Sequence, residues 1–503
     1  MTDVRTILEA LCIILVTNLL FVAPAVGKPL ALEKDQLYLV FDPRLQGVGQ
    51  NCELKVHQFK RHPLNPLIKP EKWNPGGWWE CCTVLWDEDA QIFKMWYTGV
   101  QVGRAGWDRY VCYAISKDGI HWKKPSLGLY EAKGSKNNNI CLTDVLEASV
   151  YRNPNATDPQ KRYEMWAVDH LRFTYHYYSP DGIRWRRAAA LAVIPAGDKQ
   201  FTPKYPGEPD KQLVRINRDP KEGLGDRQFT YWFPGVQKFV CFQKAQSLSG
   251  PPWRTFVRFE SRDGINWDLD NPTWVLKTDK EDEKFDPLLE FYGLGIHPVG
   301  DFYLMTPQLF HAAQGDHADV GLAYSVDTVR WYRAFRGQTI FPRGAEGEWD
   351  WGWIGQAPNI VEKDGMWWMY YFGFPYTHYD ERRKKEDPRL TTSPWGIGLA
   401  QMPIGRIVSA RSWRTEGSWT IGPVQLSGAK LQLNARIYEQ LRLTILDEQE
   451  KPIPGFEVTI GPADSLELPV VFANGSDLSA LSAQAVKIRF ELKNAEVFGF
   501  KCE

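Results

Sequence analysis

The chain has 503 residues, which is enough to bury a large core and to form more than one domain. Its 60 basic and 61 acidic residues give a formal net charge of −1, and no basic stripe stands out. The composition therefore argues against a nucleic-acid or other polyanionic partner. Aromatic residues form 14% of the chain and include 22 tryptophans. Such side chains pack between sheets, and they also form the platforms on which sugars stack.

The first 27 residues are typical of an export signal. Ile7 to Val26 is mostly apolar, and small residues at 23–25 or 25–27 suit cleavage by a signal peptidase. Because the apolar run approaches the length that crosses a bilayer, an uncleaved N-terminal anchor is the alternative. We therefore expect a secreted or periplasmic protein with no membrane contact beyond this segment.

Seven cysteines follow the export signal, and their odd number leaves at least one thiol free. They are scattered, without a CxxC pair or a His/Cys cluster at zinc spacing. We interpret most of them as core residues. The sequence indicates no metal and no cofactor.

A seven-residue pattern recurs along the chain at intervals of roughly 65 to 80 residues. Three copies share a central Asp-Gly pair and a final tryptophan, and a fourth copy has diverged: Ser116–Trp122, Ser179–Trp185, Ser261–Trp267 and Ser325–Trp331. The Asp-Gly pair predicts a turn, because Asp bonds nearby backbone and Gly accepts a positive φ. We expect the tryptophan to pack between sheets. A repeat of this length, rich in short strands, favours the blade of a β-propeller.

The strand pattern predicts an all-β protein with five blades between about residues 73 and 410, after an N-terminal extension at 28–72. In the fifth blade, Asn359–Val361 is the expected inner strand and Arg406–Ser409 the closing strand. Short alternating strands at 411–503 then predict a small antiparallel β-sandwich.

Acidic residues precede the expected inner strands, whose first residues face the funnel of a propeller. Four of the five equivalent positions carry an acid: Glu80, Glu147, Asp226 and Glu290. The fifth carries Gln356, with Asp350 just upstream. Crowded carboxyl groups raise some pKa values, and glycosidic cleavage needs one protonated and one ionised carboxyl. The alternatives are pairing with bases such as Arg152 and Arg227, or a calcium site.

Three further residues are candidates for substrate binding. Trp79 precedes Glu80, and His311 and His378 each end a second strand in an aromatic setting. A histidine there can donate to a sugar hydroxyl. The alternative is a hydrogen-bonded core histidine.

With these features the chain resembles the five-bladed β-propeller glycosidases of families 32 and 43, over residues 73–410. The order of propeller and sandwich is also similar to family 32, and uncharacterised secreted family-32-like proteins of bacteria resemble it more closely. They share patterns seen here as Phe302–Pro307 with His311 and as Trp349-Asp350. The resemblance implies a nucleophile or base at Glu80, a transition-state stabiliser at Glu147 and an acid/base at Asp226.

The chain departs from family 32 at each motif. Glu80-Cys-Cys-Thr stands in place of Asn-Asp-Pro-Asn-Gly, Leu146-Glu-Ala in place of Arg-Asp-Pro, and Asp226-Arg227 in place of Glu-Cys. Fructoside specificity is therefore not inherited from the resemblance.

The sequence favours a secreted, metal-independent glycoside hydrolase that acts on a carbohydrate substrate, with exo-cleavage if the funnel is closed. Glu80 is the expected nucleophile or base, Asp226 the general acid, and Glu147 a group that orients sugar hydroxyls. A non-catalytic glycan-binding propeller is the main alternative. A sialidase-like enzyme, which needs an arginine triad and a tyrosine nucleophile, and a phosphorolytic enzyme are further rivals.

Overall fold

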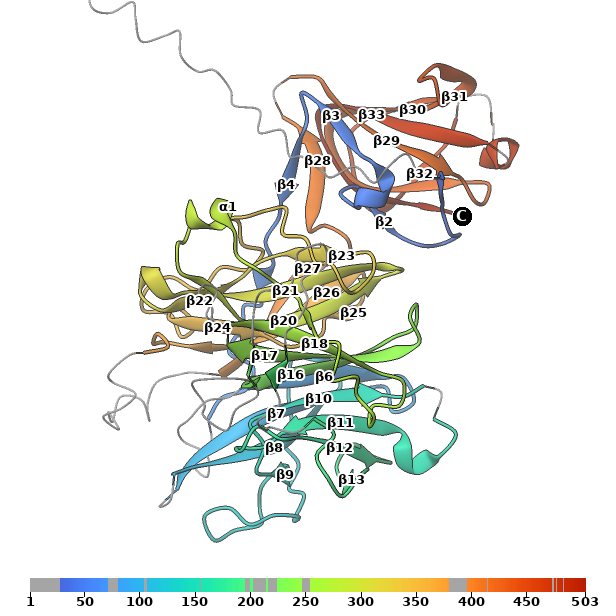
Figure 1. Cartoon of the computed structure of the whole chain (residues 1–503). Coiled ribbons are helices and arrows are strands. Elements are labelled where there is room, and N and C mark those ends of the chain that lie inside the picture. The colour runs from blue at the N-terminus through green and yellow to red at the C-terminus, as the bar shows by residue number, and fades with distance from the viewer. Residues whose placement is uncertain are drawn as a thin grey trace, which may run out of the picture.

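The structure of the chain is a computed structural model that describes residues 28–70, 80–103, 106–154, 156–194, 200–201, 214–215, 224–246, 254–379, 396–413, 415–472, 475, 477–482 and 484–503. Within these residues the chain is almost wholly β, as expected (Figure 1). One short helix, α1 (Lys280–Glu283), and the 3-10 turns Pro43–Leu45, Pro159–Lys161, Ala312–Gln314 and Leu478–Leu481 are also present. None of the helices in these ranges has the length and hydropathy to span a bilayer.

Three antiparallel sheets of four strands follow one another along the chain. The first contains β6 (Glu80–Asp87), β7 (Ile92–Gly103), β8 (Gly106–Ser116) and β9 (Ile140–Thr143). The second contains β10 (Glu147–Arg152), β11 (Tyr163–Val168), β12 (Thr174–Ser179) and β13 (Arg186–Arg187). The third contains β16 (Leu224–Phe233), β17 (Lys238–Gln246), β18 (Arg254–Ser261) and β19 (Thr273–Trp274). A separate two-stranded pair, β14 (Gln200–Phe201) and β15 (Val214–Arg215), precedes the third sheet.

A nine-stranded sheet comes next and contains two antiparallel groups. One group is β20 (Leu289–Val299), β21 (Phe302–His311), β22 (His317–Val320) and β23 (Ala323–Ser325). The other is β24 (Trp353–Gln356), β25 (Val361–Lys363), β26 (Met366–Phe374), β27 (Gly396–Pro403) and the N-terminal strand β5 (Lys60–Arg61). A single parallel pair, Ala318 with Trp353, joins them. Because the two groups form one sheet by pairing, the number of five blades stays a prediction.

The innermost strands of these sheets contact one another in a closed ring. β6 contacts β10, β10 contacts β16, β16 contacts β20, β20 contacts β24, and β25 and β26 return to β6. The stacked sheets lie in the lower part of Figure 1. This closed order of sheets is the arrangement of a β-propeller.

Two strands of the last group differ from the expectation. The inner strand is β24, which begins at Trp353, and Gln356 ends this strand instead of preceding it. The segment at 406–409 does not close the blade, because β28 (Val408–Ser412) pairs with strands of a separate ten-stranded sheet. The outer position beside β27 is taken by β5, from far earlier in the chain. Hydrogen bonding to the N-terminal strand β5 thus completes the last group of strands, which the local sequence pattern did not indicate.

The remaining strands form a ten-stranded sheet that folds around its own apolar core. Its two longest strands, β30 (Leu431–Leu446) and β33 (Ala485–Cys502), pair along most of their length. The others are β1 (Leu30–Ala31), β2 (Tyr38–Leu39), β3 (Val48–Gln50), β4 (Glu53–Val56), β29 (Gly417–Gln425), β31 (Pro452–Ile460), β32 (Ala463–Val470) and β28. The N-terminal extension therefore belongs to this unit through β1–β4, and it reaches the propeller only with β5.

The repeated turns hold neighbouring sheets together. In the first copy, Asp118 Oδ1 accepts hydrogen bonds from the backbone N–H of residues 120 and 121, and Gly119 has a φ of +73°. This confirms the predicted turn chemistry. Trp122 packs between Phe93 of its own sheet and Tyr370 of the last sheet, as expected of a residue between blades.

The carbonyl of each turn glycine accepts a hydrogen bond from the preceding sheet. Trp96 Nε1 donates to Gly182 at 2.6 Å, and Trp166 Nε1 donates to Gly264 at 2.8 Å. At the junction of the first and last sheets, the Tyr370 hydroxyl donates to Gly119 at 2.9 Å. Both indoles are fully buried, so each bond satisfies a donor that has no water available.

The divergent copy keeps the geometry with other residues. Thr328 takes the glycine position with a φ of +61°, and its hydroxyl accepts from Arg258 of the preceding sheet at 3.2 Å. The sheet contact is preserved although the Asp-Gly pair is lost.

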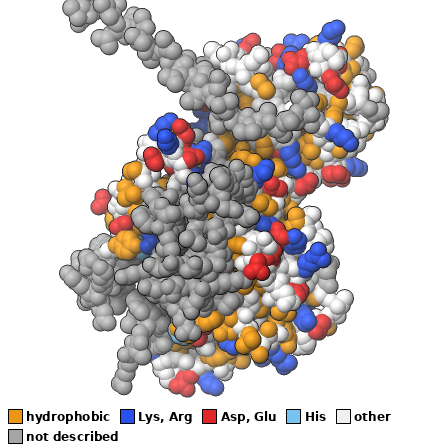
Figure 2. Space-filling view, in the orientation of Figure 1, with side chains coloured by type: hydrophobic (Ala, Val, Ile, Leu, Met, Phe, Trp, Pro, Cys, Tyr) orange, Lys and Arg blue, Asp and Glu red, His pale blue; other side chains and the backbone are white. Residues whose placement is uncertain are grey.

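Apolar clusters fill the spaces between the sheets, and five cysteines of the described part are unpaired. Four of these are buried, as the core interpretation expected: Cys112, Cys141, Cys241 and Cys502. On the face drawn in Figure 2, acidic and basic side chains are interspersed over the described surface.

We predict that Gly264→Ala destabilises the protein by about 2–4 kcal/mol. A Cβ at this position would lie 2.5 Å from a ring carbon of Trp166, and the φ of +73° is unfavourable for alanine. Urea unfolding followed by tryptophan fluorescence measures the change.

Gly134→Ala is the matched control. Gly134 has a φ of +76° but no atom near the position of a Cβ, so only the backbone cost of about 1–2 kcal/mol applies. Equal losses in the two variants would contradict a packing role for the contact with Trp166.

Candidate active site at the mouth of the ring

The inner strands β6, β10, β16, β20 and β24 all begin at one end of the ring, which we call the mouth. Contacts between distant segments define it. Arg172, in the loop after β11, meets Asp226 near the start of β16, and Arg254, at the start of β18, meets Glu290 at the start of β20. Asp226, Glu290 and Glu147, which pairs with Arg227, therefore lie at the mouth.

Irregularities in the strands aim side chains at the mouth. In β20 the register shifts between Phe291 and Gly293, which leaves Tyr292 as the extra residue of a bulge. In β16 the shift covers residues 225–227 and includes Asp226 and Arg227. Bulges re-aim side chains and terminate regular pairing, and they are common beside active sites.

Glu147 is buried at the first position of β10. Its Oε2 lies 3.1 Å from Nε of Arg227, which is also buried. A buried ion pair of this kind fixes both groups, because each charge is costly without the other. Pairing with Arg227 was the alternative that the sequence left open for an acid at the mouth.

Asp226 has two basic neighbours. Its Oδ2 lies 3.1 Å from Nη1 of Arg172, and its Oδ1 forms an ion pair with Nζ of Lys244. The side chain of Asp226 is 28% exposed, whereas that of Lys244 is 6% exposed. Asp226 therefore faces the mouth from above a buried lysine. Contact with two cations favours the ionised form of the carboxyl group.

Tyr292 lies at the centre of this group. Three cations from neighbouring strands approach its ring: Lys244 at 3.7 Å, Arg254 at 5.6 Å and Arg227 at 5.9 Å from the centroid. Its hydroxyl lies 2.9 Å from Nε2 of His378. The aromatic face thus holds the cations in place through cation–π attraction.

Glu290 forms an ion pair with Arg254, whose other Nη donates to the Tyr379 hydroxyl at 2.6 Å. Burial raises the pKa of Glu290 above its ordinary value, and Asp316 adds to the rise, although Arg254 and Lys244 oppose it. A carboxyl group that holds its proton to higher pH can serve as a general acid.

His311 is held between two carboxylates. Its Nδ1 lies 2.8 Å from Asp286 and its Nε2 lies 3.3 Å from Asp319, which also pairs with Arg343. Burial alone would lower the pKa of His311, but the two carboxylates outweigh it and raise the pKa to about 9. Both ring nitrogens are thereby engaged by the protein, so the geometry favours the alternative of a structural histidine.

Two other candidates are engaged within the fold. Asp350 is buried and accepts hydrogen bonds from Arg61 at 2.8 Å and from the Tyr371 hydroxyl at 2.9 Å, which ties β5 to the last group of strands. Gln356 is also buried and donates to the carbonyl of Thr306. His378, in contrast, belongs to the group around Tyr292.

The remaining two candidates are only partly covered by the structure. The backbone of Glu80 begins β6 at the mouth, but its side chain lies outside the described part, and Trp79 lies outside it altogether. Their predicted roles stay predictions. Across the described residues, no group of three or more His, Cys, Asp or Glu is arranged to hold a metal ion.

Sequence reasoning missed the basic half of the site and its central ring: Arg172, Lys244, Arg254, Tyr292 and Tyr379. One signal was available. Lys244 follows the apolar run Phe239–Phe242 within a single strand, and a lysine in a buried strand needs a partner. The other residues stand in loops, at a bulge or, for Arg254, at the first position of a strand, where the alternation of a strand does not predict direction.

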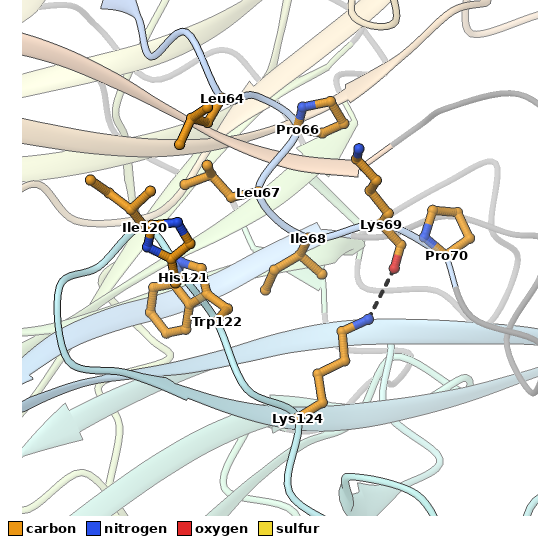
Figure 3. Close-up of a pocket in the computed structure, with 10 residues that line it drawn as sticks. All are labelled: Leu64, Pro66, Leu67, Ile68, Lys69, Pro70, Ile120, His121, Trp122 and Lys124. Carbon is orange, nitrogen blue, oxygen red and sulfur yellow. Dashed lines mark hydrogen bonds between the residues drawn. The ribbon is translucent and has the colours of Figure 1, made fainter.

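A separate groove of about 570 Å³ lies beside the first repeated turn (Figure 3). The segment 64–70 forms one wall, and Ile120, His121, Trp122 and Lys124 form the other. Nζ of Lys124 donates to the Lys69 carbonyl across it at 2.9 Å. No candidate residue lines this groove.

No family model matches the chain, and no curated protein matches it. Solved structures do. The chain is similar to a glycosyl hydrolase from Bacteroides ovatus, with 14% identity over 70% of this chain and 96% of that one, and a TM-score of 0.41. It is similar to the GH32 β-fructofuranosidase of Bombyx mori, with 10% identity over 89% and 93% and a TM-score of 0.38. A β-1,2-mannobiose phosphorylase from Listeria innocua gives 12% identity over 69% and 98% and a TM-score of 0.42.

We predict that His311 stabilises the protein below neutral pH and loses this effect in alkali. Its pKa is about 9 in the folded state, against an ordinary value of 6.5. The contribution is therefore complete below about pH 6.5 and disappears as the pH rises through 9. Thermal unfolding of wild type and His311→Gln between pH 6 and 10 measures it.

The two melting temperatures should converge as the pH increases. A constant difference over this range would contradict a charged His311. The pKa of Asp319 is lowered, so this carboxyl group titrates only in acid, outside the range from pH 6 to 10.

Proposed function

We propose that the protein is a glycoside hydrolase that cleaves a carbohydrate substrate with carboxyl groups at the mouth. The observation that supports this most is the position of Glu147, Asp226 and Glu290 at the starts of successive inner strands. Glu290 is buried and has a raised pKa, whereas Asp226 is partly exposed and lies between Arg172 and Lys244. Glycosidic cleavage needs this difference between two carboxyl groups.

The roles differ in part from those that the resemblance implies. Glu290 suits the general acid, because burial raises its pKa. Asp226 suits a carboxylate that stays charged, as base or nucleophile, because Arg172 and Lys244 flank it. Glu80 stays a second candidate for the nucleophile or base. Glu147, fixed by Arg227, is suited to orienting its neighbours or the sugar hydroxyls.

Two further parts of the proposal rest on the sequence. The apolar N-terminal segment supports a secreted or periplasmic location, with cleavage or retention of the segment both open. The substrate would be cut from its end if the ring is closed at the far side of the mouth.

The second candidate function is a non-catalytic glycan-binding propeller. Its supporting observation is that each of the three acids described at the mouth with its side chain is ion-paired. Ion pairs hold a binding surface rigid without requiring proton transfer. Release of sugar products would indicate the hydrolase, and glycan binding without product release would indicate the binding propeller.

The test is a product screen of the secreted form against a polysaccharide panel, with and without inorganic phosphate. Wild type should release sugar. Glu290→Gln, Asp226→Asn and Glu80→Gln should each lower kcat/KM by about 100-fold or more, since general acid–base catalysis contributes factors of this size. Sugar phosphates formed only with phosphate would identify phosphorolysis instead.

Glu164→Gln is the matched control. Glu164 is a buried carboxylate at the other end of the second sheet, where it contacts His176 at 2.9 Å. This variant should keep its activity. Binding of glycans without any release of products would favour the non-catalytic alternative.

The pH profile provides a further prediction. If Glu290 is the general acid, the alkaline limb of kcat/KM lies above the ordinary range of a glutamate, because activity is lost only as Glu290 ionises. Arg254 opposes the raised pKa, so Arg254→Met should move this limb to higher pH. A limb that stays in place, measured with a saturable substrate from pH 4 to 10, would assign the acid to another residue.

A further inference from the structure

Two arginines from neighbouring sheets act on each other electrostatically. Arg109 lies in β8 of the first sheet, and Arg172 lies in the loop after β11 of the second. Burial lowers the pKa of Arg172, and the positive charge of Arg109 lowers it further. Like charges repel, and an anion bound beside Arg172 would relieve this repulsion.

The cations at the mouth lie at two depths. The side chains of Arg227 and Lys244 are 4% and 6% exposed, beneath the ring of Tyr292 and its neighbours. Those of Arg172 and Arg254 are 23% and 18% exposed. The two arginines can therefore contact a ligand at the mouth, while the buried pair adds positive charge from below.

Nearby carboxylates compensate part of this charge. Glu147, Asp226 and Glu290 are in contact with the cations, and Asp169 and Asp316 act on them from a greater distance. The mouth therefore does not attract anions by net charge alone. Selectivity would come from the directed N–H groups of the arginines, which match the oxygens of a carboxylate or sulfate in pairs.

We infer that the sugar bound at the mouth is acidic, and that Arg172 and Arg254 hold its carboxylate or sulfate group while the buried Lys244 adds positive charge from below. This inference rests on the proposed function for the position of the site, but it does not require turnover. The balanced net charge of the chain argued against a polyanionic partner, but it does not exclude a local anion-binding cluster. A balanced overall charge reports the whole surface, whereas this cluster is local and lies within one funnel.

The test compares matched acidic and neutral probes. Wild type is titrated with oligogalacturonate and its carboxyl-reduced form, and with a sulfated galactan and its desulfated form, by calorimetry and by affinity electrophoresis. We expect at least one acidic probe to bind about tenfold or more tightly than its neutral counterpart. Arg172→Gln should abolish that preference, so that the acidic probe binds no more tightly than its neutral counterpart.

Arg184→Gln is the matched control. Arg184 carries the same charge on a repeated turn, is 69% exposed and pairs with Asp181 away from the mouth. This variant should retain the full preference. Equal binding of acidic and neutral probes, or a preference that survives Arg172→Gln, would overturn the inference.

Two other outcomes separate this inference from the proposed function. Arg172-dependent binding of an acidic probe without turnover would support the inference and contradict the hydrolase. Turnover of neutral glycans by wild type, with no binding of any acidic probe, would do the reverse. A third arm titrates inorganic phosphate alone: Arg172-dependent binding of phosphate, with only neutral glycans recognised, would assign the oxyanion site to phosphate and overturn the acidic sugar.

Discussion

The hydrogen bond from a buried side chain of one sheet to the turn carbonyl of the next is the interaction on which the ring depends. Trp96 and Trp166 make it through their indoles, and Tyr370 makes it through its hydroxyl at the closing junction. Each donor is buried and would be costly without its acceptor. The turn that presents the carbonyl requires a positive φ at that residue, so sheet packing and turn chemistry constrain each other.

The outer strand of the last group is supplied by the N-terminal extension. The extension first contributes β1–β4 to the C-terminal sheet and then contributes β5 beside β27. Arg61 on β5 reaches Asp350 and thereby connects the outer strand to the interior of the last group. The two units of the protein thus share one segment, and each depends on pairing between residues that lie hundreds of positions apart in sequence.

The closed ring brings the strand starts together and so creates the site. Asp226, Arg227 and Tyr292 lie in irregular stretches of β16 and β20, and these irregularities aim their side chains toward the same space. Around Tyr292 the cations are as important as the acids. They pair with Asp226, oppose the raised pKa of Glu290, and would provide directed donors for an anionic group. Acid–base chemistry and substrate recognition would therefore share residues.

The sequence by itself determined the all-β class, the turn repeat and the acids at the strand starts. These follow from local rules, since alternation predicts strands, Asp-Gly predicts a turn, and the start of an inner strand faces the mouth. Only the tertiary structure decided the partners: β5 in place of residues 406–409, the structural surroundings of His311 and Asp350, and the convergence of Arg172, Lys244 and Arg254 on Tyr292. These depend on contacts between distant segments and on bulges that shift the alternation of a strand, so no local pattern encodes them.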